Sequence, residues 1–285
     1  MSSTLAPNEA HAPRDRGSYF LPTAHESRDE MQRLDDTHEA FRQYFGGSLC
    51  FAPLAQEEPR KILELGCGSG AWAIQAAKQF PNAHVLAVDV APLPDRIIPT
   101  NMKFRLVDLS RPSDLETETF DIVHARMVMT HVSHGREALL RAARFVKPGG
   151  LLLMEDIDLR SLAESGGPAV FRYISKMIEA WGTRGADTEL GRKMEGILRT
   201  LEFFPDVHAE RIAMPFAGTS ADKAMNELGV ALRKSWLQAA EKAGSRLAGY
   251  GVTEEMIREH NEELGRRDSS AMMVMYFCWA RRSLF

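Results

Sequence analysis

A glycine-rich stretch, Gly66-Cys67-Gly68-Ser69-Gly70, lies between a short apolar run at residues 61–65 and a helix-compatible run at residues 71–79. Glycine lets the backbone turn tightly and lets a ligand approach it closely. A strand that passes through such a loop into a helix is typical of the first unit of an α/β nucleotide-binding fold. A purely structural turn explains the stretch less well, because it holds three glycines.

The alternation of strands and helices continues after this loop. A doubly wound parallel sheet with right-handed crossovers is therefore expected. The expected strands are 61–65, 84–90, 103–107, 120–125 and 151–155, and the expected helices are 26–45, 71–79 and 136–145. After residue 158 the pattern changes to helices at 167–181, 190–203, 221–248 and 253–265, with strands at 207–214 and 271–279.

Charge and composition exclude several classes of protein. The 285 residues carry a formal net charge of −4, which gives no electrostatic footprint for a nucleic-acid backbone. No apolar run approaches the ~18 residues of a membrane span. Three scattered cysteines and a polar stretch at residues 1–17 without an apolar signal core lead us to expect a cytoplasmic protein. We expect a monomer or homodimer.

Acidic residues follow the first three strands, where a cofactor would lie. Asp89 comes nineteen residues after Gly70, the spacing at which a carboxylate accepts hydrogen bonds from ribose hydroxyls, with Val90 beside it. Glu64 can face a methionine ammonium, which favours S-adenosylmethionine over the pyrophosphate of NAD. Asp108 can accept from an adenine amine with Leu109 against the ring, or it can be a turn aspartate before Pro112.

The ordered set of motifs resembles the class I S-adenosylmethionine-dependent methyltransferases. It comprises Ile62-Leu63-Glu64-Leu65-Gly66-Cys67-Gly68-Ser69-Gly70, Val88-Asp89, Val107-Asp108, Phe120-Asp121-Ile122-Val123 and Val146-Lys147-Pro148-Gly149-Gly150. The resemblance implies a Rossmann-like seven-stranded sheet with a final antiparallel strand, and S-adenosylmethionine as cofactor. It also implies that the glycine loop, including Gly66, Cys67 and Gly68, holds that cofactor.

An upstream segment resembles the N-terminal element of fungal secondary-metabolism (LaeA-like) methyltransferases. It contains Tyr19-x-Leu21-Pro22 and Glu30-x-x-Arg33-Leu34-x-x-x-His38. The resemblance implies a lid helix over the cofactor, in which Arg33 meets the methionine carboxylate, and Tyr19 either closes the pocket or anchors the helix. The alternative for Arg33 is a surface ion pair with Glu30 or Asp36.

The resemblance also divides the chain. We expect a flexible tail at residues 1–17 and a single methyltransferase domain at 18–285. Within it, residues 18–58 form the lid region, 59–158 the cofactor-binding core, and 159–285 a helical substrate cap with closing strands.

The expected fourth strand points its carboxyl end at the site of methyl transfer. We expect the backbone at Ala125 and the neighbouring Arg126 to contact the cofactor. His131 is the best candidate for a general base, because it lies just after this strand, although a structural histidine is the commoner occurrence. No metal is expected, because the carboxylates Glu155, Asp156 and Asp158 have no further matched ligand.

Three functions remain open from the sequence. The first is a methyltransferase that acts on O or N of a small, partly aromatic or apolar metabolite; the lack of an Asp/Asn-Pro-Pro-aromatic run argues against a nucleobase acceptor. The second is a methyltransferase-like regulatory subunit that acts through protein partners. The third is a nicotinamide-dependent oxidoreductase.

Overall fold

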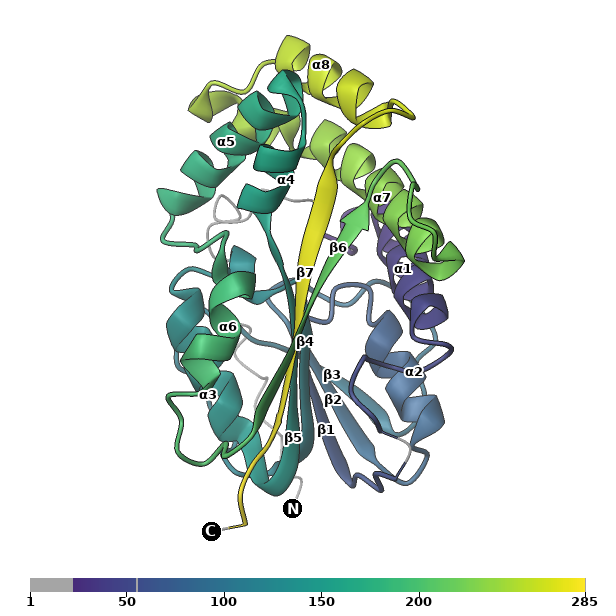
Figure 1. The fold of residues 1–285 in the computed structure, drawn as a ribbon. Helices are drawn as coiled ribbons and strands as arrows, with labels where there is room; N and C mark the ends of the chain where they lie inside the picture. The colour runs from purple at the N-terminus through teal and green to yellow at the C-terminus, as the bar shows by residue number, and fades with distance from the viewer. Residues whose placement is uncertain (1–22, 55, 285) are drawn as a thin grey trace, which may run out of the picture.

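The computed structural model describes residues 23–54 and 56–284. The expected tail at 1–17 and the candidate Tyr19 therefore lie outside the described residues. One seven-stranded sheet runs through the molecule in the order β3-β2-β1-β4-β5-β7-β6 (Figure 1). Its strands are β1 (Lys61–Leu65), β2 (His84–Asp89), β3 (Met102–Leu106), β4 (Phe120–Arg126), β5 (Val146–Asp158), β6 (Val207–Pro215) and β7 (Met272–Arg281).

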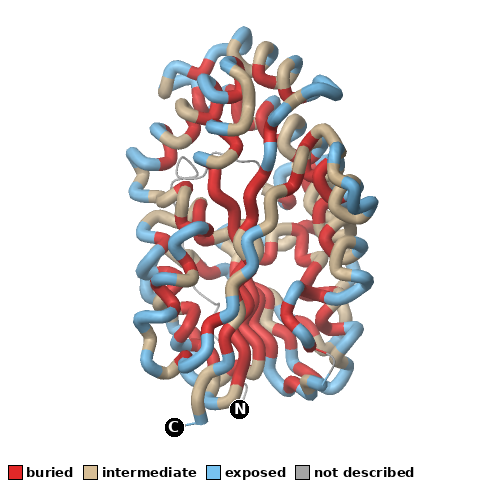
Figure 2. Tube along the Cα trace, in the orientation of Figure 1, coloured by how far each residue is buried: buried red, intermediate tan, exposed pale blue. Residues whose placement is uncertain are grey.

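The sheet is parallel from β3 to β5, and β7 runs antiparallel between β5 and β6. This order and the single antiparallel strand confirm the expected sheet. The central strands are apolar runs because both faces are covered (Figure 2). Ile62 packs with the α2 side and Leu63 with the α3 side, as alternation along a strand requires.

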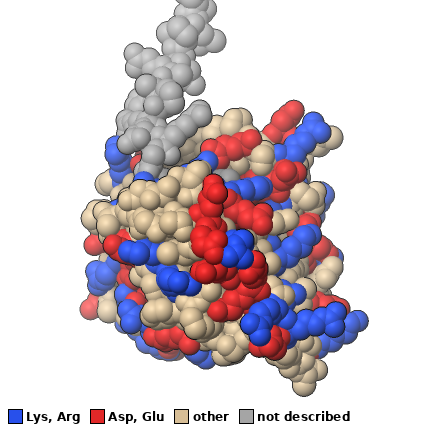
Figure 3. All heavy atoms as spheres, turned by 90° about the horizontal axis from the view of Figure 1, so that it is seen from above, with Lys and Arg blue, Asp and Glu red and all other residues tan. Residues whose placement is uncertain are grey.

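Helices pack on both faces and also extend the molecule at one end. α2 (Ala71–Gln79) covers one face, and α3 (Gly135–Phe145) with α6 (Leu190–Leu198) covers the other. A cap formed by α4 (Leu159–Ser165), α5 (Pro168–Gly182), α7 (Lys223–Leu247) and α8 (Glu254–Gly265) sits at the upper end in Figure 1. Seen from above, its outer face mixes acidic and basic side chains (Figure 3).

The N-terminal helix α1 (Arg28–Tyr44) joins this cap to the sheet. Ser27 caps it by accepting a hydrogen bond from the Glu30 backbone N–H at 3.0 Å, and Gly46 with Gly47 ends it in left-handed conformations. α1 packs along α7, and Phe41 enters the cap core fully buried. The expected lid helix is therefore an integral part of the packed structure.

Several boundaries that we expected are wrong, and β5 begins at Val146 instead of residue 151. β5 does not end at residue 155 but continues to Asp158 and leads directly into α4, which the sequence pattern did not indicate. The charged residues at its end resembled a loop, yet they are buried and paired inside the protein. The helix expected at 190–203 ends at Leu198, and β3 begins and ends one residue earlier than expected.

Candidate active site

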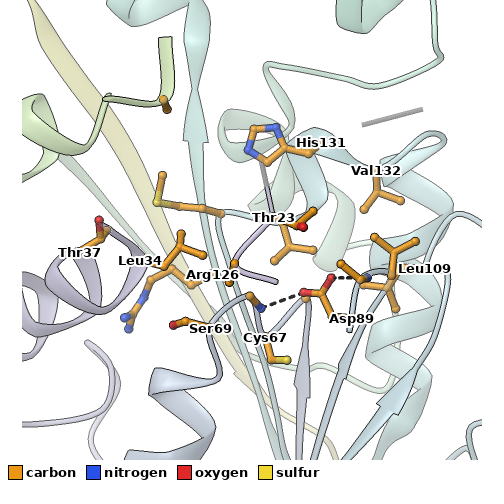
Figure 4. A pocket seen from close by; sticks show the side chains of 18 of the residues that line it. Thr23, Leu34, Thr37, Cys67, Ser69, Asp89, Leu109, Arg126, His131 and Val132 are labelled. Atoms are coloured by element: carbon orange, nitrogen blue, oxygen red, sulfur yellow. Dashed lines mark hydrogen bonds between the residues drawn. The ribbon is translucent and has the colours of Figure 1, made fainter. Parts of the chain in front are cut away.

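A cavity of about 750 Å³ lies where the carboxyl ends of the parallel strands meet α1 and the cap. Ligand sites in open α/β sheets occur at this edge, and the volume lies within the usual range of roughly 300–1,000 Å³. In Figure 4, Asp89 and Leu109 lie on one side of the cavity, Leu34 and Thr37 of α1 on the other, and His131 above them.

The structure brings almost all the described candidate residues to this cavity. Ala125 is the exception, because it is buried within β4 and does not line the cavity. The candidates that do line it are Arg33, Glu64, Gly66, Cys67, Gly68, Asp89, Val90, Asp108, Leu109, Arg126 and His131.

The glycine loop is held in a conformation that side chains would disturb. Gly66 has a φ of +64°, and a Cβ on it would lie 2.5 Å from a methyl of Val128. The Gly68 N–H donates to Asp89 Oδ2 at 2.8 Å, while the Ala91 N–H donates to Asp89 Oδ1 at 3.0 Å. Burial raises the pKa of Asp89, against the effect of these bonds. Each carboxylate oxygen keeps a further acceptor position for a ligand hydroxyl.

Asp108 lines the cavity and also has the alternative role considered above. Its Oδ1 accepts from the backbone N–H of Ser110 at 2.9 Å and from the Ser110 hydroxyl at 2.6 Å. Its Oδ2 lies 3.4 Å from Arg111 Nε. The side chain therefore stabilises the turn after β3 at the rim of the cavity.

Glu64 is a buried acidic residue at the glycine loop with an unsatisfied oxygen. Its side chain is buried, and Oε2 has no hydrogen-bond partner among the described residues. Burial raises the pKa of Glu64 to about 8, although Arg126 acts in the opposite direction. A buried carboxylate oxygen without a partner costs free energy until a donor reaches it. The site is thus prepared for a cationic or donating group beside the glycine loop.

A buried polar layer that the sequence did not indicate lies beside Glu64. His124 stacks on Trp72 with ring centroids 3.8 Å apart. Its Nδ1 lies 4.0 Å from Glu64 Oε1 and its Nε2 3.9 Å from Glu155 Oε2, too far for hydrogen bonds. Burial lowers the pKa of His124 to about 4, so the ring is neutral at pH 7. The layer is evident only from the structure, in which His124 is buried within β4.

Arg126 contacts both this layer, through Glu155, and the lid helix, through Phe41. It donates from Nε to Glu155 and from Nη2 to the Leu49 carbonyl at 2.9 Å, and its guanidinium lies 4.6 Å from the centroid of Phe41. Burial acts to raise the pKa of Glu155, but Arg126 holds that pKa below its ordinary value. Arg126 therefore has internal partners, and its main observed effect is to position α1 over β4 and β5.

Arg33 forms a buried ion pair, not the surface pair that was its alternative. Its guanidinium donates to Glu30, whose side chain is 0 % exposed, and Nη1 donates to Ser235 Oγ of α7 at 2.5 Å. Arg33 also lines the cavity. Glu30 was one of the two partners that the sequence suggested for Arg33, but Ser235 was not, because it lies about two hundred residues from Arg33 and leaves no local signal.

Arg96 is a second contact that the sequence did not indicate. Its Nη1 donates to Asp35 of α1 at 3.0 Å and to the Ser69 carbonyl of the glycine loop at 2.7 Å. One side chain therefore ties the lid helix to the loop.

His131 ends a short 3₁₀ turn (Met129–His131) just after β4 and lines the cavity. Its ring lies 5.3 Å from that of Trp181. Burial, with a contribution from Arg33, lowers the pKa of His131 to about 4. The imidazole is therefore neutral at pH 7 and can accept a proton.

The carboxylates at the end of β5 have protein partners. Asp156 accepts from the Thr130 backbone and hydroxyl and from the Ile157 N–H, and Asp158 pairs with Arg192. Across residues 23–54 and 56–284, no three His, Cys, Asp or Glu side chains are arranged to hold a metal ion. Over the same ranges, no helix is both long enough and apolar enough to cross a membrane.

The sheet order and the glycine loop define a class I S-adenosylmethionine-dependent methyltransferase fold. The chain belongs to the family described as "Methyltransferase domain", whose model matches residues 37–200. The protein solved in complex with the Haloferax volcanii methyltransferase activator Trm112 shares this fold, with a TM-score of 0.51 and 14% identity over 95% of this chain and 99% of that one.

Two fungal relatives show which branch of the family this is. Methyltransferase str2 of Strobilurus tenacellus is 32% identical over 258 residues, covering 89% of this chain and 93% of str2. The secondary metabolism regulator LAE1 of Cochliobolus heterostrophus is 35% identical over 149 residues, covering 50% of this chain and 47% of LAE1. The resemblance to LaeA-like proteins is thus confirmed, and the match to str2 covers 89% of this chain, which is enough to include most of the cap.

The buried histidines predict acid sensitivity of the fold. Burial lowers the pKa values of His38, His124, His131 and His260 to about 4, below the ordinary value of 6.5. Between about pH 6.5 and 4, these histidines are therefore protonated in the unfolded chain but neutral in the folded protein. We expect the free energy of unfolding to fall as the pH drops from about 6.5 towards 4, by up to about 1.4 kcal/mol per pH unit for each histidine.

Glu64, Asp89 and Asp156 act in the opposite direction, because burial raises their pKa values and a raised carboxyl pKa favours the folded state at low pH, but they are fewer than the four histidines. Urea unfolding between pH 7.5 and 5 measures the slope, and His260→Gln should reduce it. A free energy of unfolding that is unchanged between pH 6.5 and 5 would contradict this account.

Proposed function

We propose that this chain binds S-adenosylmethionine in the cavity and transfers its methyl group to O or N of a small, largely apolar metabolite. The observation that carries the proposal is Glu64, a buried carboxylate at the glycine loop with an oxygen that has no partner. An ammonium beside Glu64 would lower the pKa that burial has raised and stabilise the carboxylate, whereas the pyrophosphate of NAD offers no positive charge to do so. The proposal therefore disfavours the oxidoreductase alternative.

The other residues fit the same cofactor. Asp89, beside the glycine loop, has acceptor positions for ribose hydroxyls, and Leu109 offers an apolar surface beside Asp108 for an adenine ring. When bound, S-adenosylmethionine supplies an electrophilic methyl group. The protein contributes binding, orientation and exclusion of water, which are the main requirements for a displacement at carbon.

His131 is the proposed general base. Its neutral imidazole can take the proton of an acceptor hydroxyl at the cavity wall. The small-molecule acceptor is supported by the cap, which supplies Met177, Trp236, Ala239 and Ala240 to the lining. The match to str2, a relative named a methyltransferase, covers 89% of this chain and favours catalysis over a purely regulatory role.

Two measurements test the proposal. Isothermal titration should detect S-adenosylmethionine and S-adenosylhomocysteine at micromolar or lower concentrations and should detect no NAD. Incubation with labelled S-adenosylmethionine and fractions of fungal small molecules should yield a labelled product. Cofactor binding without a labelled product in any fraction would favour the regulatory alternative, and the lack of cofactor binding would refute the proposal.

Asp89→Ala is expected to weaken binding of S-adenosylhomocysteine by about 1–3 kcal/mol, because ribose hydroxyls and the Gly68 N–H lose a charged acceptor. The affinity of Asp89→Asn should lie between those of Asp89→Ala and the wild type, because the amide keeps one acceptor oxygen. Isothermal titration gives the affinities. Asp114→Ala, at an exposed carboxylate outside the cavity, is the matched control. An unchanged affinity in a folded Asp89→Ala protein would contradict the ribose assignment.

A further inference from the structure

Two hydrogen-bond donors that the cap helices contribute to the cavity have no partner among residues 23–54 and 56–284. Tyr173 of α5 is 0 % exposed, and its hydroxyl makes no hydrogen bond with any described residue. The indole N–H of Trp236, on α7, is also buried and unpaired within the described chain. Both residues line the cavity. Buried donors are usually satisfied, so two of them in the lining of one cavity indicate that a ligand supplies the missing acceptor.

The Tyr173 side chain is fixed in place from behind. Its ring packs against the buried His260 of α8, with centroids 4.3 Å apart. Burial raises the pKa of the Tyr173 phenol, which therefore remains a donor at neutral pH. The hydroxyl has no alternative role in the cap, because nothing described there accepts from it.

Small and apolar residues of the cap helices line the cavity together with these donors. Met177 of α5 and the small residues Ala239 and Ala240 of α7 complete this part of the lining. The nearby cation Arg33 already has its charge balanced by the buried Glu30. A charged ligand group would be costly among such partners, whereas a neutral oxygen needs only donors.

We propose that Tyr173 and Trp236 form a recognition pair that donates hydrogen bonds to the oxygen of an uncharged aromatic acceptor molecule. α5 and α7 lie on different sides of the extended ends of β5 and β7, so the ligand is gripped between two parts of the cap (Figure 1). This assignment rests on the proposed function, since it names the substrate class for that site. It makes these two residues determinants of specificity, not of methyl transfer itself.

The test uses two probes of the same shape, one with a carbonyl oxygen and one without. Equilibrium dialysis measures 2-acetylnaphthalene and 2-ethylnaphthalene binding to the full chain loaded with S-adenosylhomocysteine. We expect the wild type to bind the acetyl compound at least about tenfold more tightly, because only that compound satisfies the buried donors. In the double variant Tyr173→Phe/Trp236→Phe the two probes should bind within about twofold of each other.

Matched substitutions outside the cavity provide the control. Tyr44→Phe/Trp279→Phe makes the same chemical changes at residues that do not line it, and should keep the wild-type preference. Titration with S-adenosylhomocysteine checks that each variant is folded, and all should bind it equally.

The outcomes separate this assignment from the proposed function. An equal preference for the acetyl compound in wild type and double variant, or no binding of either probe to the loaded wild type, would overturn the recognition pair. A failure of the wild type to bind S-adenosylhomocysteine would instead refute the proposed function, and the probe preference is then measured on the free protein.

Discussion

Gly68→Val is expected to abolish detectable binding of S-adenosylhomocysteine while the sheet remains folded. Gly68 has a φ of +54°, a conformation that β-branched residues avoid. A Cβ there would lie 3.2 Å from Leu34 of the lid helix, so the two additional methyl groups must displace the lid or enter the cavity. The change also disturbs the N–H that donates to Asp89. We expect a loss of at least about a hundredfold in affinity, or about 2.7 kcal/mol.

Gly251→Val is the control that separates backbone strain from obstruction of the cavity. Gly251 has a φ of +81°, but a Cβ there meets nothing within 4 Å, and it lies outside the cavity. Both variants should therefore lose stability of the order of 1–2 kcal/mol from the left-handed backbone, and only Gly68→Val should lose binding. Isothermal titration and urea unfolding measure the two effects. Retained affinity in Gly68→Val would mean that the loop is only a structural turn.

The loop and its strands were predictable because their signals are local. Parallel strands buried on both faces are short apolar runs, and the glycines at 66, 68 and 70 all adopt positive φ between β1 and α2. The positions of Asp89 and Asp108 at strand ends followed from that rhythm. Asp108 shows the limit of such reasoning. The sequence offered a turn residue or a cofactor contact as alternatives, and in the structure Asp108 both stabilises the turn and lines the cavity.

Contacts that join distant parts of the chain were not predictable. Thr37 and Arg33 both bond to Ser235, and no local pattern marks a serine within a long helix as their partner. The end of β5 was missed for a related reason. Asp158 resembles a loop residue until Arg192 supplies the opposite charge that allows its burial. These features depend on contacts between residues far apart in the sequence, so composition and periodicity could not predict them.

His131→Ala is expected to lower turnover by about 10²–10⁴ if an acceptor hydroxyl must lose its proton, with little change in cofactor affinity. His131→Asn should not restore turnover, because an amide does not accept a proton at neutral pH. His134→Asn is the matched control. It lies three residues on, also lines the cavity, and has a φ of +56° that asparagine tolerates, so we expect only a few-fold effect.

The pH profile provides the sharper test of His131. An unperturbed histidine would give a limb near pH 6.5, but burial and Arg33 place the pKa of His131 at about 4. A base acts when deprotonated, so turnover should rise with pH through about 4 and be flat from about 5 to 8. Because acid also weakens the fold, single-turnover rates after a brief pH jump are the appropriate measurement. The limb should disappear in His131→Ala. A retained limb with only a few-fold loss of rate would make His131 a packing residue and leave catalysis to the alignment of a neutral nucleophile with the methyl group.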